Sequence, residues 1–267
     1  MSRSSPPSRL SAAPGERLLR PLRYAVRVPL FTLHLALGLP LTLLAINRFT
    51  ARWTLDGERM DHHAIRWWSG TLMRIFGMRV RRVGQPLREA HLLVANHVSW
   101  IDIELVHSQR VVGFVAKSEI SRWPLVGWLA GRAGTIYHQR GSNASLSSVL
   151  DLMVGRLDSG QAVGAFPEGG TNGGDAVRTF HARIFQAAFE AQVPVQPVAL
   201  RYGTGGSAQT VVAFAPGENF LQNFLRLLGE PSRVAEVHFL PPILPGEEGR
   251  RQVAERARES IVAAMES

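Results

Sequence analysis

One histidine and one aspartate stand at a spacing that can support acid–base chemistry. His97 follows an apolar run at 91–95, and Asp102 comes five positions later. Functional groups gather at the carboxyl ends of strands in parallel sheets, so a histidine there is a candidate for catalysis. Residues five apart on a continuous helix point about 140° apart, so the two side chains meet only if His97 precedes the helix. Ser99, predicted as the capping residue, fits a helix that starts between them.

The spacing favours a hydrogen-bonded pair that acts as a general base. If Asp102 accepts a hydrogen bond from one ring nitrogen of His97, the other nitrogen remains able to take a proton. The alternative is a structural histidine, and the chain has nine histidines. We expect a structural role for most of the others, among them His62, His63, His107 and His238.

A second apolar run, at 162–166, is followed by a glycine-rich loop that contains one carboxylate. The loop spans 167–174 and reads Pro-Glu-Gly-Gly-Thr-Asn-Gly-Gly, with the carboxylate at Glu168. Glycines let backbone amides approach a phosphate or a developing oxyanion closely, although a flexible turn is the simpler explanation of the glycines alone. Glu168 can either bind hydroxyl groups of a ligand or brace the loop by accepting bonds from its amides.

The elements that must position these residues alternate between strands and helices after residue 80. Apolar, β-branched runs predict strands at 91–95, 111–116, 134–137, 162–166, 195–200, 211–214 and 234–240. Helical spacing predicts helices at 101–108, 146–157, 183–191, 220–228 and 247–265. This alternation predicts an α/β catalytic domain over 80–267, with a mixed, largely parallel sheet covered by helices.

The N-terminal part is predicted to associate with a membrane. Residues 1–16, rich in proline and serine, are predicted to be a disordered tail. Residues 28–46 carry no charge, and as a helix they extend about 29 Å, close to the roughly 30 Å of a hydrocarbon core. An amphipathic helix predicted at 63–78 suits a membrane interface as well as it suits docking on the protein core. We therefore expect a membrane-associated helical segment over 17–79.

The mode of membrane contact stays open. Pro29, Gly38 and Pro40 interrupt the apolar run, and arginines flank both of its ends, so a single span and a re-entrant or shallow helix compete. The further alternative is a core helix of a soluble protein. A signal peptide is not expected, because no small-residue cleavage site follows Ile46.

Composition narrows the classes of partner. The formal net charge is +9, and Lys117 is the single lysine, so arginine supplies almost all of the positive charge. An excess of this kind fits an acidic lipid, a phosphorylated substrate or nucleic acid. The arginines are scattered and no nucleic-acid-binding motif occurs, so we expect no nucleic acid partner. The chain has no cysteine and no His-Glu-x-x-His spacing, and we expect neither a metal nor a cofactor.

Four segments, in order, resemble motifs of the phospholipid acyltransferase superfamily, whose members include enzymes that acylate 1-acyl-glycerol-3-phosphate. Asn96-His97 with Asp102 resembles the first motif, His-x4-Asp. The segments 134–140, 166–169 and 193–200 resemble the second, third and fourth motifs. The resemblance implies that His97 is a general base oriented by Asp102. The base would deprotonate a lysolipid hydroxyl, which attacks the thioester of acyl-CoA or acyl carrier protein.

The resemblance also implies a set of substrate-binding residues. They are Asn96, Lys117, Arg140, Glu168, Gly169, Gly170, Thr171 and Arg178. Arg140 and the loop of the third motif are expected to hold the phosphate and glycerol of the acceptor, and the fourth motif to line or support the acyl site. The third motif departs from the family pattern, because Gly170 and Thr171 stand where a threonine and then often an arginine are found. Arg178, Arg183 or Arg140 would supply the lost charge.

The function expected from these motifs is the acylation of 1-acyl-sn-glycerol-3-phosphate to phosphatidic acid. The expected partners are membrane lipid, the lysophospholipid acceptor and the thioester donor. The resemblance places the protein at a bacterial inner membrane, with the catalytic domain facing the cytoplasm. Two alternatives remain, the O-acylation of a lyso-aminolipid such as lyso-ornithine lipid, and a membrane-surface module without catalytic activity.

Overall fold

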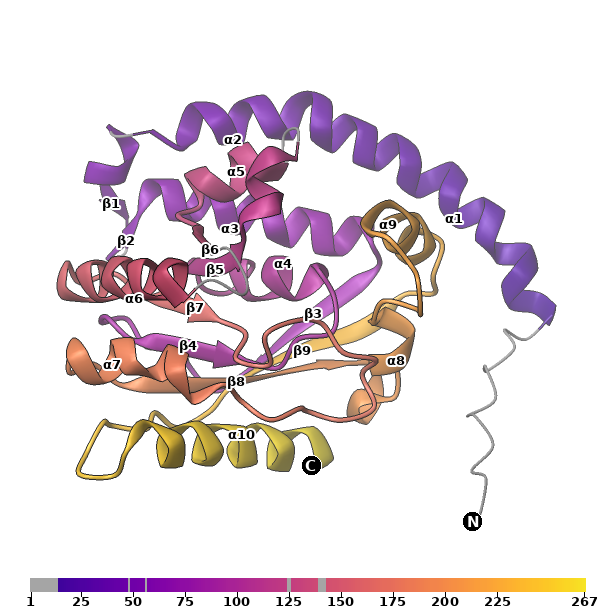
Figure 1. Cartoon of the computed structure of the whole chain (residues 1–267). Coiled ribbons are helices and arrows are strands. Elements are labelled where there is room, and N and C mark those ends of the chain that lie inside the picture. Colours follow the sequence, from indigo (N-terminus) through magenta and orange to yellow (C-terminus); the bar gives the residue numbers. More distant parts are fainter. Residues whose placement is uncertain (1–13, 48, 56, 124–125, 139–142) are drawn as a thin grey trace, which may run out of the picture.

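The centre of the fold is one seven-stranded sheet in the strand order β3-β9-β8-β4-β7-β5-β6 (Figure 1). The computed structural model describes residues 14–267 except 48, 56, 124–125 and 139–142. The strands are β3 Met78–Val83, β4 Leu92–Ala95, β5 Gly113–Lys117, β6 Ile136–His138, β7 Val163–Ala165, β8 Val195–Tyr202 and β9 Arg233–Phe239. Strands β8 and β9 pair antiparallel, and the other neighbours pair parallel. The predicted mixed, largely parallel sheet is confirmed.

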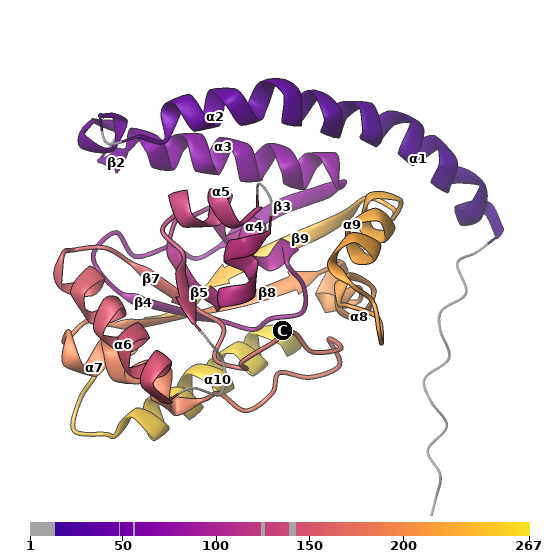
Figure 2. The ribbon, with the colours of Figure 1, turned by 45° about the horizontal axis from the view of Figure 1, so that its top comes forward.

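Helices cover both faces of this sheet (Figures 1 and 2). On one side lie α1 Pro14–Leu33, α2 Leu39–Ala45, α3 Met60–Ile75, α4 Ile101–His107 and α9 Phe220–Leu228. On the other lie α6 Asn143–Asp158, α7 Gln186–Glu190 and α10 Arg250–Glu266. Strand β4 contributes Leu93 and Ala95 to one core cluster, and Leu92 and Val94 to the other. Since successive side chains of a strand point to opposite faces, β4 is buried on both sides and fixes the position of whatever follows it.

Short elements complete the fold. A separate two-stranded sheet pairs β1 Thr54–Leu55 with β2 Glu58–Arg59. The remaining helices are α5 Val126–Arg132, α8 Gln209–Val212, the π-helix η1 His34–Gly38, and the 3₁₀ turns η2 Thr50–Arg52, η3 Ser118–Arg122, η4 Ala182–Phe185 and η5 Thr204–Gly206.

The strand predicted at 211–214 is wrong, because helix α8 occupies that region. Gln209 at its start is buried, and its side chain accepts a hydrogen bond from the Tyr202 amide and donates one to the Leu200 carbonyl. These bonds fold the segment back onto the end of β8. The apolar residues at 211–213 therefore fill a gap against the sheet instead of extending it.

Strand β3 was not predicted, and the helix expected at 63–78 ends earlier. Helix α3 stops at Ile75, Gly77 follows with a φ of 73°, and Met78 begins β3. Arginines at 79, 81 and 82 are exposed on this edge strand and hide its alternating pattern. Charged side chains on an edge strand are a common way to prevent unwanted pairing with another chain.

The N-terminal helical run extends from Pro14 to Ala45 through α1, η1 and α2, and arches over the domain (Figure 2). Helix α1 includes 14–16, so the end of the predicted tail is helical, and 1–13 lie outside the described residues. Residues 18–45 are long and apolar enough to cross a membrane. Their exposed side chains include Leu18, Leu22, Leu30, Leu37, Leu41 and Leu44.

Helix α1 is docked on the C-terminal end of α9 by hydrogen bonds. The buried Arg27 donates to the carbonyl oxygens of Leu228, at 3.0 Å, and Glu230, at 2.7 Å. The hydroxyl of Tyr24 donates to the carbonyl of Leu225 at 2.8 Å. The last carbonyls of a helix lack intrahelical donors and lie at the negative end of its dipole, so a guanidinium group satisfies them well. The helix therefore has a fixed position on the domain.

Replacing this arginine tests the docking. We expect Arg27→Ala to lower the free energy of unfolding in neutral detergent by roughly 1–3 kcal/mol, because it leaves buried carbonyl groups without donors. Limited proteolysis should also cut the 18–45 segment faster. Tyr24→Phe removes one exposed bond to the same helix and serves as the control, with a smaller effect. Equal denaturation midpoints for Arg27→Ala and the wild type would contradict the docking.

Candidate active site

His97 and Asp102 meet in the connection between β4 and α4. The Nδ1 atom of His97 lies 2.8 Å from Oδ2 of Asp102. The imidazole is 15% exposed and the carboxylate is fully buried. The contact forms because His97 precedes the helix, whereas Asp102 lies in its first turn. Within the part of the chain that the structure describes, Nε2 of His97 has no hydrogen-bond partner, so this nitrogen is available to a substrate.

The carboxylate of Asp102 is bonded through both oxygens. Besides His97, Oδ2 accepts from the backbone amides of Val98, at 2.7 Å, and Ser99, at 2.9 Å. Oδ1 accepts from the hydroxyl of Tyr202 at 2.5 Å. Asp102 itself therefore satisfies the amides that lead into α4. The capping role predicted for Ser99 is wrong, because no side chain caps this helix and the Ser99 hydroxyl donates to Asn223.

Tyr202 is a member of the site that sequence reasoning missed. Its side chain is fully buried at the end of β8, and burial, followed by the charge of Asp102, raises the pKa of the phenol well above its ordinary value. The hydroxyl therefore keeps its proton and donates it to the carboxylate. One hundred positions separate the two residues, so no local pattern connects them.

The imidazole of His97 is also held by aromatic stacking. Its ring lies parallel to that of Phe166, with centroids 3.9 Å apart and an interplanar angle of 12°. Phe166 in turn stacks on Phe114 of β5, at 4.8 Å and 4°. Gly164 makes this arrangement possible, because an added Cβ there would lie 2.8 Å from the Phe114 ring. The stack and the bond to Asp102 together fix the orientation of the imidazole.

Glu168 links the glycine-rich loop to the residue that carries the imidazole. Its Oε1 accepts from the His97 amide at 2.8 Å, and its Oε2 accepts from the Arg178 amide at 2.9 Å and from the side chain of Asn172. The Asn172 amide donates back to the His97 carbonyl at 3.1 Å. Burial raises the pKa of the Glu168 carboxyl, and these hydrogen bonds oppose the rise. Of the two predicted roles of Glu168, the geometry matches the bracing of the loop.

The other predicted residues of this edge differ in what they can contact. The Asn96 side chain is 2% exposed and exchanges two hydrogen bonds with the backbone of Leu200, so it joins β4 to β8. Gly169, with a φ of 74°, is exposed in the loop, and Gly170 and Thr171 beside it are half-buried. This loop surface is therefore open to a ligand, whereas Asn96 is committed to the sheet.

Two of the predicted basic residues lie at the end of a strand and in the segment after the glycine-rich loop. Lys117 is exposed at the end of β5, and the Arg178 side chain is exposed while its amide bonds Glu168. Arg140 lies outside the described residues, two positions after the end of β6. Strands β5 and β6 run parallel, with Lys117 opposite His138. Lys117 and His138, the last residue of β6, therefore lie at the same end of the sheet.

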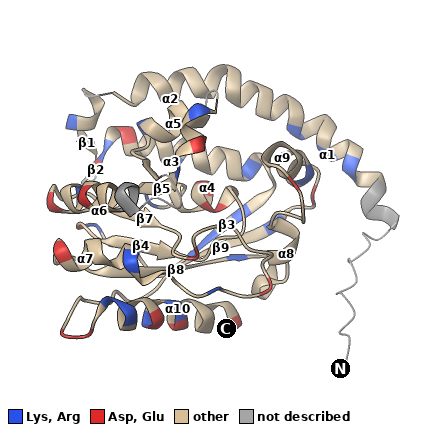
Figure 3. Cartoon of the chain, in the orientation of Figure 1, with Lys and Arg blue, Asp and Glu red and all other residues tan. Residues whose placement is uncertain are grey.

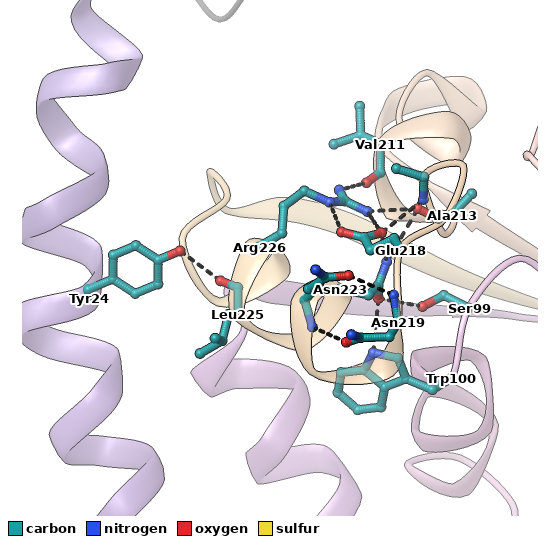
Figure 4. A network of polar contacts seen from close by, with 12 residues as sticks. Tyr24, Ser99, Trp100, Val211, Ala213, Glu218, Asn219, Asn223, Leu225 and Arg226 are labelled. Carbon is teal, nitrogen blue, oxygen red and sulfur yellow. Dashed lines mark hydrogen bonds and ion pairs between the residues drawn. The ribbon is translucent and has the colours of Figure 1, made fainter.

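A polar network centred on Asn223 of α9 holds the turn after His97 (Figure 4). The fully buried Asn223 accepts through Oδ1 from the Ser99 hydroxyl, at 3.1 Å, and the Trp100 indole, at 3.0 Å. Its Nδ2 donates to Glu218 at 2.9 Å. Two hydrogen bonds from Arg226 to Glu218 lower the pKa of this carboxyl to about 2. The helix that docks α1 thus also holds the turn of the active site.

Three of the histidines for which a structural role was predicted bond to neighbouring parts of the fold. His107 bonds the Val112 carbonyl, His238 contacts Glu236 and His63 contacts the Leu55 carbonyl. Burial lowers the pKa of His62 to about 4. Among the described residues, no group of three His, Asp or Glu side chains is placed to hold a metal ion.

Comparison with known proteins places this geometry in a family. The acyltransferase family model matches residues 78–201. A lyso-ornithine lipid O-acyltransferase from Pseudomonas aeruginosa is 34% identical over 233 residues, which are 84% of this chain and 90% of the relative. The chain belongs to the acyltransferase family. It is an O-acyltransferase.

Other relatives agree with this membership. A 1-acyl-sn-glycerol-3-phosphate acyltransferase from Neisseria gonorrhoeae is 38% identical over 123 residues, which cover 45% of this chain and 48% of the relative. The crystal structure of the 1-acyl-sn-glycerophosphate acyltransferase of Thermotoga maritima matches with a TM-score of 0.69 and 19% identity, over 94% of this chain and 98% of that one. This structure confirms the acyltransferase fold.

Removing the hydroxyl of Tyr202 tests its bond to Asp102. We expect Tyr202→Phe to lower the kcat of acyl transfer by about tenfold, the equivalent of roughly 1.4 kcal/mol. The reason is that Asp102 loses one of the donors that hold its carboxylate, and with it the His97 ring, in place. Tyr24→Phe is the control, and an unchanged kcat in Tyr202→Phe would contradict the assignment.

Replacing Glu168 with glutamine, its amide analogue, tests whether the carboxylate braces the loop. Glu168→Gln keeps the size of the side chain but points an NH₂ group at backbone donors. A displacement of His97 by about 1 Å should then lower kcat by roughly 100-fold. Asp175→Asn makes the same charge change at an exposed position directly after the loop and should leave kcat unchanged. Equal kcat values for the two variants would rule out the bracing.

Proposed function

We propose that this acyltransferase moves a fatty acyl group from the thioester of acyl-CoA or acyl carrier protein to the hydroxyl of a single-chain lipid, with His97 as general base. The observation that carries the proposal is the 2.8 Å bond between His97 Nδ1 and the buried Asp102, with Nε2 left without a partner among the described residues. Membership of the acyltransferase family supports the reaction class.

The proposed mechanism uses these atoms in sequence. Nδ1 of His97 donates to Asp102, so Nε2 accepts the proton as the lipid hydroxyl attacks the thioester carbonyl. The tetrahedral intermediate then collapses, the carbon–sulfur bond breaks, and the thiolate takes the proton back from the imidazolium. Asp102 stabilises the transient positive charge and holds the ring in place. General-base assistance of this kind contributes about 10² to 10⁴-fold in rate.

The substrate-binding residues divide into two groups in this proposal. Gly169, Gly170 and Thr171 offer an open loop surface next to His97, and the exposed side chains of Lys117 and Arg178 offer positive charge. We include Arg140, which lies outside the described residues, in the charged group. Asn96 and Glu168 contribute indirectly, because their polar atoms hold β4 and the loop in register.

The proposed acceptor is a lyso-aminolipid of the lyso-ornithine type. The Pseudomonas aeruginosa relative with that specificity matches along 90% of its length, whereas the Neisseria gonorrhoeae phosphate-lipid enzyme matches along 48%. Thr171 also stands where the family pattern often offers an arginine to a phosphate group. The second candidate is 1-acyl-sn-glycerol-3-phosphate, favoured by the exposed Lys117 and Arg178, which can pair with a phosphate monoester.

The acceptor resides in a bilayer, so the enzyme is proposed to work at the surface of the inner membrane, with the catalytic domain on the cytoplasmic side. The exposed leucines of α1 and α2 supply an apolar face, and Arg27 keeps α1 on the domain instead of letting it project away. A helix held along the domain in this way suits shallow insertion parallel to the bilayer. The complete His97–Asp102 arrangement argues against a module without activity.

The acceptor and the base can be tested in one assay. Purified protein in neutral detergent is incubated with acyl-CoA or acyl carrier protein donors and with lyso-ornithine lipid or 1-acyl-sn-glycerol-3-phosphate, and thiol release and two-chain product are followed. We expect lyso-ornithine lipid to give the higher kcat/KM, and folded His97→Ala to lose at least 10²-fold. A preference for the phosphate lipid would select the second acceptor. Full activity in His97→Ala would refute the proposed base.

A further inference from the structure

A groove separate from the catalytic loop runs between helix α3 and edge strand β3. Its volume is 680 Å³. The α3 wall consists of His63, Arg66, Trp67, Gly70 and Arg74, which follow one another along the same side of the helix. The opposite wall includes Met78, Arg79 and Val80 of β3, and Ser108, Gln109 and Ser232 complete the lining. None of these residues belongs to the proposed reaction site.

The groove is positively charged and rich in donors. Arg66 is paired with Glu58 through Nη1, but its buried Nε has no acceptor among the described residues. Arg74 and Arg79 are exposed, and neither has a carboxylate partner in the described part of the chain. A smaller cavity of 260 Å³ shares Arg79 and Ser232 with the groove and adds Arg233. Guanidinium groups and hydroxyls of this kind match the oxygens of a phosphate.

The centre of the groove is open because of a glycine. Gly70 lies between Arg66 and Arg74 on the face of α3, and an added Cβ there would meet nothing within 4 Å. Any other residue at this position would place its side chain in the space between the arginines. A larger side chain at this position would therefore occupy part of the groove.

The groove lies directly beneath the helix that we propose to insert in the membrane. Trp67, at its rim, is half-exposed and its ring lies 5.7 Å from that of His34 in η1. Helix α3 packs below α1 and α2, and β3 lies below α3 (Figure 2). If the leucines of α1 and α2 enter the boundary between headgroups and acyl chains, the next layer of protein lies at headgroup level. Tryptophan and arginine are the residues that favour this level.

We propose that the α3–β3 groove binds the phosphate of an anionic phospholipid and thereby holds the enzyme on acidic membrane. The lipid is a docking partner and not the acyl acceptor, whose site is the loop beside His97. The inference rests on the proposed surface insertion of α1 and α2. Arg74 and Arg79 contact the phosphate, Arg66 offers its spare Nε–H as a donor, and Trp67 lies beside the glycerol region.

Two variants separate a defined site from general attraction. Gly70→Met fills the groove without changing charge, and R74Q/R79Q removes its two unpaired cations. The control R250Q/R251Q removes two cations from α10, where basic and acidic residues alternate on the opposite side of the sheet (Figure 3). Each protein is mixed with vesicles of phosphatidylcholine alone or of phosphatidylcholine with phosphatidylglycerol. Cosedimentation gives the binding, and acyl transfer on the same vesicles gives the activity.

We expect the wild type and R250Q/R251Q to prefer the phosphatidylglycerol vesicles. R74Q/R79Q should bind them about 30-fold more weakly, from roughly fivefold per basic residue near an anionic surface. Gly70→Met should lose at least fivefold, although methionine favours a helix more than glycine does. Normal binding by Gly70→Met together with weak binding by R74Q/R79Q would indicate diffuse attraction and overturn the proposed site. Normal binding by both groove variants would overturn it as well.

Two further measurements distinguish failure of the proposed lipid site from failure of the proposed function. Activity in neutral detergent micelles should be unchanged in both groove variants. Loss of this activity in a groove variant would refute the claim that the groove is separate from the reaction site. Inactivity of the wild type in micelles would instead count against the proposed function. Thermal unfolding with excess inorganic phosphate provides the other comparison. Stabilisation that is lost in Gly70→Met, together with normal binding of that variant to the vesicles, would assign the groove to a soluble anion and overturn the lipid.

Discussion

The buried carboxylate of Asp102 is the group on which the geometry of the site depends. It accepts bonds from the His97 ring, from two backbone amides before α4 and from the Tyr202 hydroxyl. A carboxylate removed from water is costly unless its oxygens are hydrogen-bonded, so these donors must stay in place for the fold to tolerate it. The same bonds fix the ring nitrogen of His97 that faces away from Asp102. Stability of the turn and orientation of the base thus have one cause.

The elements around this turn are joined by polar contacts as well as by apolar packing. Glu168 connects the glycine-rich loop to the His97 backbone, and Asn96 connects β4 to β8. Asn223 connects α9 to the turn, while Arg27 connects α9 to the N-terminal helix. The helix proposed to enter the membrane and the turn that carries the base are therefore bonded to the same short helix, α9. A lipid substrate would meet a site whose position relative to the bilayer is fixed.

Charge is distributed over the molecule in a way that suits a membrane surface. Arg74 and Arg79 line a groove near the apolar N-terminal run, whereas arginines and glutamates alternate on α10 across the sheet. Net charge alone, at +9, is compatible with several anionic partners. The position of the unpaired arginines relative to α1 and α2 is what favours lipid, because electrostatic attraction to a bilayer fades within a Debye length of about 10 Å.

The sequence by itself determined the order of most elements, the parallel character of the sheet and the pairing of His97 with Asp102. These features follow from the periodicity of apolar residues along the chain and from residues that are close together in sequence. The sequence did not predict strand β3, because its arginines obscure the alternation of apolar and polar residues. It also did not predict helix α8, because the apolar residues of that segment are typical of a strand. Tertiary structure alone decided that Tyr202 and Asn223 reach the turn, that Glu168 braces the loop and that Asn96 is bonded within the sheet. Their partners lie up to 124 positions away, and only the completed fold brings such distant groups within hydrogen-bonding distance.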